Sequence, residues 1–209
     1  FSIVQWTGDG GQSTVAHGLS SAPEIVIQKN LDSTSNWWFY TTAIDGSYDY
    51  LKLDTTDLKS DYAQDAPTNT LFTSHGWGST SMIAYCWHSV DGFSKFGSYK
   101  GNANADGPFV YLGFKPAWIL FKANNTANWY ITDNKMFTFN PNGAEFHPNT
   151  TSVQTTLAGG RGVDYLSNGF KIRQESGYGY NYSGVDVFYM AFAEHPFIGS
   201  GSKSPVTAR

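Results

Sequence analysis

Apolar and polar residues alternate with a period of two along most of the chain, and no segment repeats its apolar positions every three to four residues over three turns. Alternation of this kind is typical of strands with one buried face. Clusters of Gly, Asn, Asp and Pro separate the alternating segments at the spacing expected of a β-sandwich. The pattern predicts strands over residues 3–6, 24–29, 37–41, 50–53, 71–74, 82–88, 95–99, 109–113, 118–123, 129–133, 169–174 and 185–193.

Two of these strands are apolar on both faces, at residues 118–121 and 188–192. A short continuous apolar run is typical of a strand that is covered on both sides. We therefore expect these two strands in the centre of their sheets.

Four separated motifs of the first half of the chain return in the second half. The pairs are residues 6–9 with 99–102, 18–19 with 113–114, 23–29 with 116–122, and 36–38 with 128–130. The offset is 93 positions from Trp6 to Tyr99 and from Lys29 to Lys122, and 92 from Trp37 to Trp129. Such a period is too long for a solenoid repeat, and it indicates one β unit that has been duplicated.

These patterns predict an all-β fold, an antiparallel β-sandwich of jelly-roll or lectin-like type built from two duplicated β units. We expect the first repeat over residues 1–92 and the second over 93–198, packed together as one body. Residues 199–209 are rich in Gly, Ser and Lys and are expected to form a flexible C-terminal tail. Because the chain begins in a strand without an initiator Met, we expect it to be a domain or processed piece of a longer protein.

Composition narrows the function classes. Charged residues make up 14% of the chain, against about a quarter in an average protein, whereas aromatic residues reach 17%. A net charge of −4 provides no basic surface for nucleic acid. No apolar run approaches the roughly 18 to 20 residues that cross a bilayer, so we expect no membrane insertion.

Metal and catalytic motifs are not evident. The five histidines show no metal-ligand spacing, and His17 and His195 are expected to fix turns through hydrogen bonds. The single Cys86 lies in an apolar strand and is expected to be a buried thiol. The segment 45–49 resembles an oxygen-ligand loop but lacks the glutamate of an EF-hand, so a hairpin turn is expected there. No cofactor is predicted, although calcium stays open because sandwich loops can supply ligands that spacing does not reveal.

Aromatic residues provide the candidate chemistry. Consecutive rings at residues 37–39 must point to alternate faces, so at least one leaves the core and meets the other half, a neighbouring subunit or a ligand. Glycine-flanked rings occur at corresponding places before the last strand of each repeat, and such loops can present a ring to solvent. Aromatic faces beside hydrogen-bonding groups suit a sugar. The predicted glycan-binding residues are Trp77, Tyr178, Tyr180, Asn181 and Tyr182.

The chain resembles a β-rich domain found near the C-termini of structural proteins of tailed bacteriophages, particularly marine and cyanobacterial phages. The matching segments are residues 15–19, 22–23, 66–68, 92–99, 105–111, 113–118, 166–171 and 191–197. The resemblance implies a tail-fibre or lectin-like virion component at the particle surface, in contact with other virion proteins. It also implies a homo-oligomer, with a trimer favoured, and it supplies no catalytic residues.

The leading hypothesis is a non-enzymatic virion domain that attaches to host surface glycans. A purely structural capsid, neck or tail decoration protein is the first alternative, in which the aromatic surfaces are buried between subunits. A glycan-degrading tail enzyme is the third, and it would need two converging carboxylates that sequence spacing cannot reveal.

Overall fold

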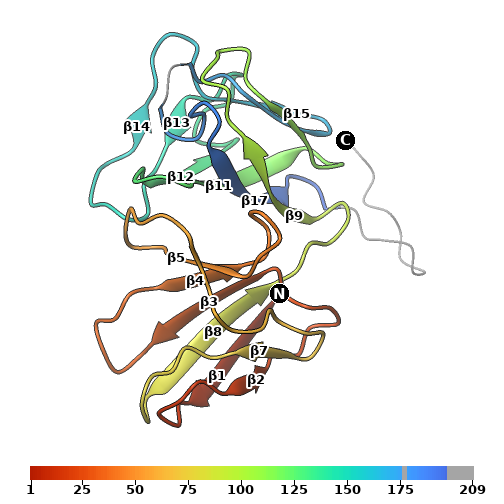
Figure 1. Ribbon diagram of the computed structural model, residues 1–209. Coiled ribbons are helices and arrows are strands. Elements are labelled where there is room, and N and C mark those ends of the chain that lie inside the picture. The colour runs from red at the N-terminus through yellow and green to blue at the C-terminus, as the bar shows by residue number, and fades with distance from the viewer. Residues whose placement is uncertain (176–177, 197–209) are drawn as a thin grey trace, which may run out of the picture. The chain divides into compact units, whose positions relative to one another are not determined.

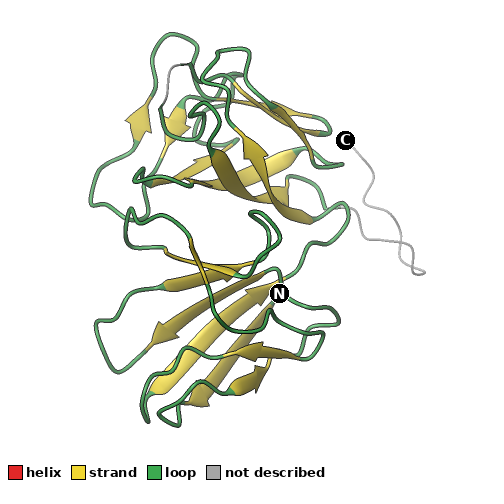
Figure 2. Cartoon of the chain, viewed as in Figure 1, coloured by secondary structure: helices red, strands yellow, loops and turns green. Residues whose placement is uncertain are grey.

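The computed structural model describes residues 1–175 and 178–196, and within them it contains strands and loops but no helix (Figure 1, Figure 2). Every strand pairing in this part of the chain is antiparallel. The prediction of an all-β antiparallel fold is therefore confirmed. The predicted tail at 199–209 lies outside the described residues.

Internal contacts divide the chain into two compact units, Phe1–His88 and Ser89–Arg209, which we call unit 1 and unit 2. The division falls close to the boundary that the repeat predicts after residue 92. The packing of the two halves into one body stays a prediction.

Unit 1 contains a six-stranded sheet and a two-stranded sheet. The order of the large sheet is β1 (Ser2–Thr7), β8 (Ser81–Trp87), β3 (Ile25–Asn30), β4 (Trp38–Thr41), β5 (Asp49–Lys52) and β6 (Ser60–Asp61). The small sheet pairs β2 (Thr14–Ala16) with β7 (Leu71–Thr73). Phe72 of β7 is buried with Val26, Ala84 and Cys86 of the large sheet, so the small sheet covers one of its faces.

Unit 2 is a sandwich of two sheets with a short hairpin. One sheet has the order β12 (Trp129–Asp133), β11 (Pro116–Ala123), β17 (Asp186–Ala193), β9 (Ser94–Lys100), and the other has β10 (Phe109–Tyr111), β16 (Gly169–Ile172), β15 (Val163–Leu166). The hairpin pairs β13 (Ala144–Glu145) with β14 (Thr155–Thr156). Phe170 of β16 lies edge-on to Phe121 of β11 at 5.5 Å between ring centroids, and these rings form part of the core between the sheets. The two strands that are apolar on both faces, β11 and β17, are central as predicted.

The two units share strand order and register. The order β1-β8-β3-β4 of unit 1 corresponds to β9-β17-β11-β12 of unit 2. Equivalent cross-strand pairs are Trp6–Met82 and Tyr99–Val187, Ile25–Trp87 and Trp118–Phe192, and Ile25–Thr41 and Trp118–Asp133. The residue numbers differ by 93 for β1 and β3, by 92 for β4 and by 105 for β8. The offsets of 93 and 92 are those of the sequence motifs, so Ile25 and Trp118 occupy the equivalent inner positions that the repeat predicts.

The repeated lysine and glycine have structural roles. Lys122 is buried, and its ammonium donates to the carbonyls of the loop after β11, at residues 123, 125 and 127. Lys29 donates in the same way to the carbonyls of Ser33 and Ser35 after β3. Each lysine therefore closes the hairpin that follows its own strand.

The repeated glycine lies at the end of the first strand of each unit. The Gly8 amide donates to the Thr80 carbonyl at 2.9 Å, and the Gly101 amide donates to the Val185 carbonyl at 2.9 Å. A Cβ on Gly101 would lie 2.2 Å from the Tyr182 carbonyl oxygen, and a Cβ on Gly8 would lie 2.5 Å from the Gly78 carbonyl oxygen. Only glycine permits this approach of the two backbones.

His17 fixes a turn, as predicted. Its Nδ1 accepts a hydrogen bond from the Leu19 amide at 3.0 Å, which leaves the proton on Nε2 to donate to the Thr68 carbonyl at 3.0 Å. The ring is fully buried, and Gly18 beside it has φ +69°. The bonds hold the turn after β2 against the loop before β7.

Candidate functional site

Half of one face of the unit 1 sheet carries a group of interacting rings. Trp38 and Tyr40 lie two positions apart on β4, so they share a face, and Tyr50 of β5 is paired directly with Tyr40. Loop residues that pack on these rings complete the group. We call the following set the aromatic cluster: Trp38, Tyr40, Tyr50, Tyr62, His75 and Trp77.

His75 lies at the centre of the aromatic cluster. Its ring centroid is 4.1 Å from that of Trp38 and 4.3 Å from that of Trp77. Burial lowers the pKa of His75 and raises that of Tyr40, so both are neutral at pH 7. The Tyr40 hydroxyl and Nδ1 of His75 share a hydrogen bond of 2.6 Å. This bond holds the His75 ring between the two tryptophans.

The aromatic cluster lies beyond the part of the face that the small sheet covers. Phe72 of β7 packs edge-on to Trp6 of β1 at 5.6 Å between centroids, whereas loop residues Tyr62, His75 and Trp77 pack over β4 and β5. In contrast to buried Phe72, five members of the cluster stay half-buried: Trp38, Tyr50, Tyr62, His75 and Trp77. These rings retain surface that a ligand can cover.

Polar groups border the aromatic cluster. The Lys52 ammonium lies 5.5 Å from the centre of a Trp38 ring and 2.9 Å from a carboxylate oxygen of Asp57. On another side, the Gln12 amide nitrogen donates to the Tyr62 hydroxyl at 2.7 Å. The arrangement places apolar ring surface beside a cation, a carboxylate and an amide.

The opposite face of the same sheet exposes a second set of rings. Phe1 is 61% exposed and lies 4.9 Å from Trp87, and Trp37 is 36% exposed and lies 6.4 Å from Tyr85. Ile3 of β1, two positions after Phe1, is 55% exposed. Trp37 and Trp38 thus point to opposite faces, as their adjacent positions require.

Two of the four predicted site residues of unit 2 are buried, which corrects the expectation of a displayed loop. Tyr180 is fully buried, with its ring stacked on Phe121 at 4.7 Å between centroids. Asn181 is also fully buried, and its side chain bonds the backbone of Asn102, Asn104 and Gln174. Gly179, at φ +60°, turns the chain so that these side chains point inward. Tyr180 and Asn181 are therefore core residues, and their predicted exposure is wrong.

Tyr182 and Tyr178 keep some surface. Tyr182 is half-buried against the unit 2 core, and Tyr178 is 37% exposed. The Tyr178 hydroxyl donates to Oε1 of Glu145 at 3.0 Å. These two residues lie in unit 2 and Trp77 lies in unit 1, so the predicted residues do not all belong to one unit.

Glu145 is a buried carboxyl. Burial raises its pKa to about 7, although the hydrogen bond from Tyr178 acts in the opposite direction. Oε2 has no hydrogen-bond partner among the described residues, and Nε2 of His147 lies 3.7 Å from Oε1. Its sequence surroundings, a two-residue strand in a turn-rich segment, do not indicate this burial.

Two carboxylates of the segment 45–49 and one of β6 surround a lysine. The Lys59 ammonium lies 2.7 Å from Oδ2 of Asp45, 2.7 Å from Oδ1 of Asp49 and 3.2 Å from Oδ1 of Asp61. The hydrogen bond from Lys59 lowers the pKa of Asp45 to about 2. The described residues contain no group of three or more His, Cys, Asp or Glu side chains arranged to hold a metal ion.

Together these features describe an antiparallel β domain whose two units share strand order and register, with one half-buried and one exposed aromatic surface on unit 1. The chain belongs to DUF7483, a family described as a domain of unknown function, which matches residues 1–196. No curated protein and no solved structure matches the chain.

Proposed function

We propose that this protein is a non-catalytic carbohydrate-binding domain of a tailed-phage virion, exposed on a tail fibre or similar adhesin and attached to host surface glycans. The observation that carries the proposal is the aromatic cluster of unit 1. Its half-buried rings lie over β4 and β5, next to Lys52, Asp57 and Gln12.

A sugar has both an apolar face and polar hydroxyl groups, which match the rings and the polar groups of this surface. The C–H face of a pyranose packs on tryptophan and tyrosine rings, while its hydroxyl groups exchange hydrogen bonds with amides, carboxylates and ammonium groups. Trp77 keeps the role that the sequence predicts for it. Trp38, Tyr50, Tyr62 and His75 join it because the fold brings two strands and two loops together.

The resemblance to phage structural proteins supports the location on the virion. It covers segments from residue 15 to residue 197, and it includes the second half of the repeat. A homo-oligomer, with a trimer favoured, and contacts with other virion proteins belong to the same proposal.

A second candidate function, structural decoration of the particle, is favoured by the opposite face of the sheet. Exposed Phe1, Ile3 and Trp37 lie there with Tyr85 and Trp87. Contiguous exposed apolar surface is typical of protein contacts. In this alternative the rings are covered by a neighbouring subunit in the particle.

The two functions are separated by two tryptophan variants, one in the aromatic cluster and one on the opposite face of the same sheet. The purified domain is applied to an array of bacterial surface polysaccharides as wild type, Trp77→Ala and Trp87→Ala. We expect Trp77→Ala to lose about 1–3 kcal/mol of binding free energy, the range of an interface anchor, and Trp87→Ala to bind normally. Normal binding by Trp77→Ala would contradict the proposed site. Failed particle assembly with Trp87→Ala, together with no glycan binding by the wild type, would favour the structural alternative.

A further inference from the structure

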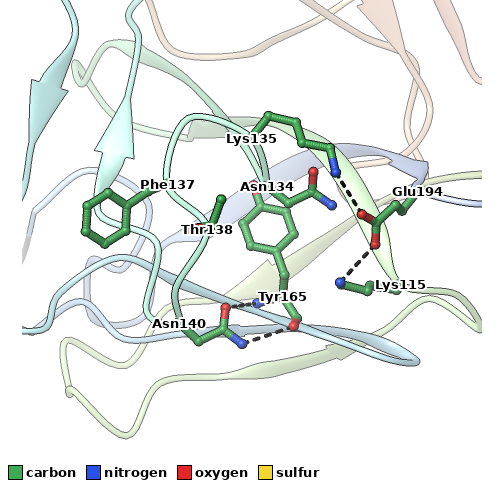
Figure 3. Close-up of a pocket in the computed structure, with 8 residues that line it drawn as sticks. All are labelled: Lys115, Asn134, Lys135, Phe137, Thr138, Asn140, Tyr165 and Glu194. Atoms are coloured by element: carbon green, nitrogen blue, oxygen red, sulfur yellow. Dashed lines mark hydrogen bonds and ion pairs between the residues drawn. The ribbon is translucent and has the colours of Figure 1, made fainter.

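Unit 2 contains a polar pocket that the aromatic cluster does not involve. The pocket has a volume of about 270 Å³. Its walls come from the segment before β11, the loop after β12, strand β15 and the segment after β17 (Figure 3). Small-molecule pockets span about 300–1,000 Å³, so this volume suits a ligand of one ring.

The charged end of the pocket holds two lysines on one carboxylate. Oε2 of Glu194 lies 2.9 Å from the Lys115 ammonium, and Oε1 lies 3.1 Å from the Lys135 ammonium. Hydrogen bonds from Lys115 and then Lys135 lower the pKa of Glu194 to about 2, so the group carries a net charge of +1 at neutral pH. An ammonium has three donors, and within the described residues each lysine bonds only Glu194. The site therefore retains donors for a second anion.

Asn134 supplies an unpaired amide. Both Nδ2 and Oδ1 are shielded from solvent, and neither has a hydrogen-bond partner in the described part of the chain. Figure 3 shows this amide between the Tyr165 ring and the Lys135–Glu194 pair, with Phe137 at the other end of the pocket. A shielded donor or acceptor without a partner costs about 1–3 kcal/mol, so a turn of the Asn134 side chain that lets a ligand in the pocket pair both atoms is favoured.

The other walls are already occupied by internal bonds. The Asn140 amide nitrogen donates to the Tyr165 carbonyl at 3.1 Å, and the Tyr165 amide donates to Oδ1 of Asn140 at 3.0 Å. The Tyr165 hydroxyl is bonded to Thr132 at 2.6 Å. Asn134, the two lysines and the hydroxyl of Thr138 are thus the polar side-chain groups that remain to recognise a ligand.

The repeat shows that the scaffold does not require these groups. The backbone amide of Asn134 donates to the Ala117 carbonyl, and the equivalent amide of Thr42 donates to the Glu24 carbonyl in unit 1. At the register offsets given above, the pocket residues Lys115, Asn134, Lys135 and Glu194 correspond to Ala22, Thr42, Ala43 and Ser89. The first copy of the repeat forms the same strand order with these small side chains, so the polar set is particular to the second copy.

We propose that this pocket binds a single acidic sugar residue, a uronic acid, with its carboxylate on the ammonium groups of Lys115 and Lys135 and neighbouring hydroxyls on the Asn134 amide. One hydroxyl accepts from Nδ2 and the next donates to Oδ1, which a vicinal diol provides at adjacent carbons. Phe137, 41% exposed, offers ring surface to the C–H face of the sugar. The ligand class rests on the proposed carbohydrate-binding function, but the site lies in the other unit and is tested separately.

The test is an NMR titration of the ¹⁵N-labelled domain with D-glucuronate, with D-glucose as the uncharged probe and acetate as the carboxylate alone. We expect glucuronate to shift the signals of Asn134 and Lys135. Its affinity should be at least tenfold above that of glucose or acetate, because each of these probes lacks part of the contacts and one hydrogen bond to a charged group corresponds to about tenfold in affinity. Equal affinity for glucuronate and acetate would overturn the proposal, as would no shift with glucuronate.

Variants link the binding to the pocket. Asn134→Leu should reduce glucuronate affinity at least tenfold without lowering the melting temperature, because it replaces an unpaired amide with an apolar group of similar size. Lys135→Gln should reduce it severalfold, whereas Trp77→Ala in unit 1 should leave it unchanged. Unchanged affinity in Asn134→Leu would contradict the assignment. Loss of polysaccharide binding in Trp77→Ala with normal glucuronate binding separates the two sites. Polysaccharide binding by the wild type that Trp77→Ala abolishes, together with no glucuronate binding by the wild type, would refute the pocket alone.

Discussion

Glu145 makes unit 2 sensitive to pH, and Glu145→Gln removes that sensitivity. The carboxyl has a pKa of about 7 in the folded protein, against 4.5 for an ordinary glutamate, because burial disfavours its charged form. Each pKa unit corresponds to about 1.4 kcal/mol, so ionisation of Glu145 lowers the free energy of unfolding by about 3 kcal/mol. Glutamine keeps an oxygen for the Tyr178 hydroxyl and carries no charge.

The sign follows from proton binding. Between pH 4.5 and about 7 the folded state holds the Glu145 proton and the unfolded state has lost it, so the free energy of unfolding falls as pH rises. The stability associated with neutral Glu145 is complete below pH 4.5 and is lost as pH passes 7. Wild type and Glu145→Gln should therefore be about equally stable at pH 4.5, and the variant should be more stable by about 3 kcal/mol at pH 8.

Urea unfolding at pH 4.5, 6 and 8, followed by a unit 2 signal such as a Tyr178 or Tyr180 NMR resonance, measures this difference. The matched control is Glu175→Gln, since Glu175 has a half-exposed side chain and a surface ion pair with Arg161. The control should show no gain at pH 8. A Glu145→Gln variant that is less stable than wild type at pH 8 would refute the reasoning. A difference in the free energy of unfolding that is the same at all three pH values would also refute it.

Four further outcomes are expected. Lys122→Met should lower the free energy of unfolding by about 3 kcal/mol or more, because three loop carbonyls lose a buried charged donor. Lys29→Met should lower the free energy of unfolding less, and urea titration compares the two variants. Tyr180→Ala should cost about 3–5 kcal/mol because its ring is fully buried, and a melting curve like that of wild type would contradict its core position. Gly101→Ala should unfold unit 2 at lower temperature, since its Cβ meets a backbone oxygen. Melting in a chelator should match melting in buffer, and a drop of several degrees would reveal a structural metal ion.

The repeat predicts more of this fold than strand propensity does. Its offsets of 93 and 92 positions anticipate which strands are equivalent, and the structure shows that these strands also pair in the same register. The sequence pattern does not predict short strands such as β2 and β15, since three or four residues contain too little alternation to recognise.

The candidate site was harder to predict. The flanking glycines of Trp77 predict a ring that keeps exposed surface. The same glycine pattern surrounds Tyr180, but the Tyr180 ring packs in the core. Local sequence does not encode whether a glycine-rich loop folds outward or inward, because that depends on the space between distant strands. Tyr62 and His75 join Trp38 for the same reason, through loops that no period describes.

The most direct test of the proposed function is a titration that follows the indole N–H signals of the seven tryptophans, each assigned with a single variant. The titrant is the polysaccharide that the array identifies. We expect the signals of Trp38 and Trp77 to shift in a saturable manner, while that of fully buried Trp129 stays in place. Shifts confined to Trp37 and Trp87, or no shift with any saccharide on the array, would contradict carbohydrate binding at the aromatic cluster.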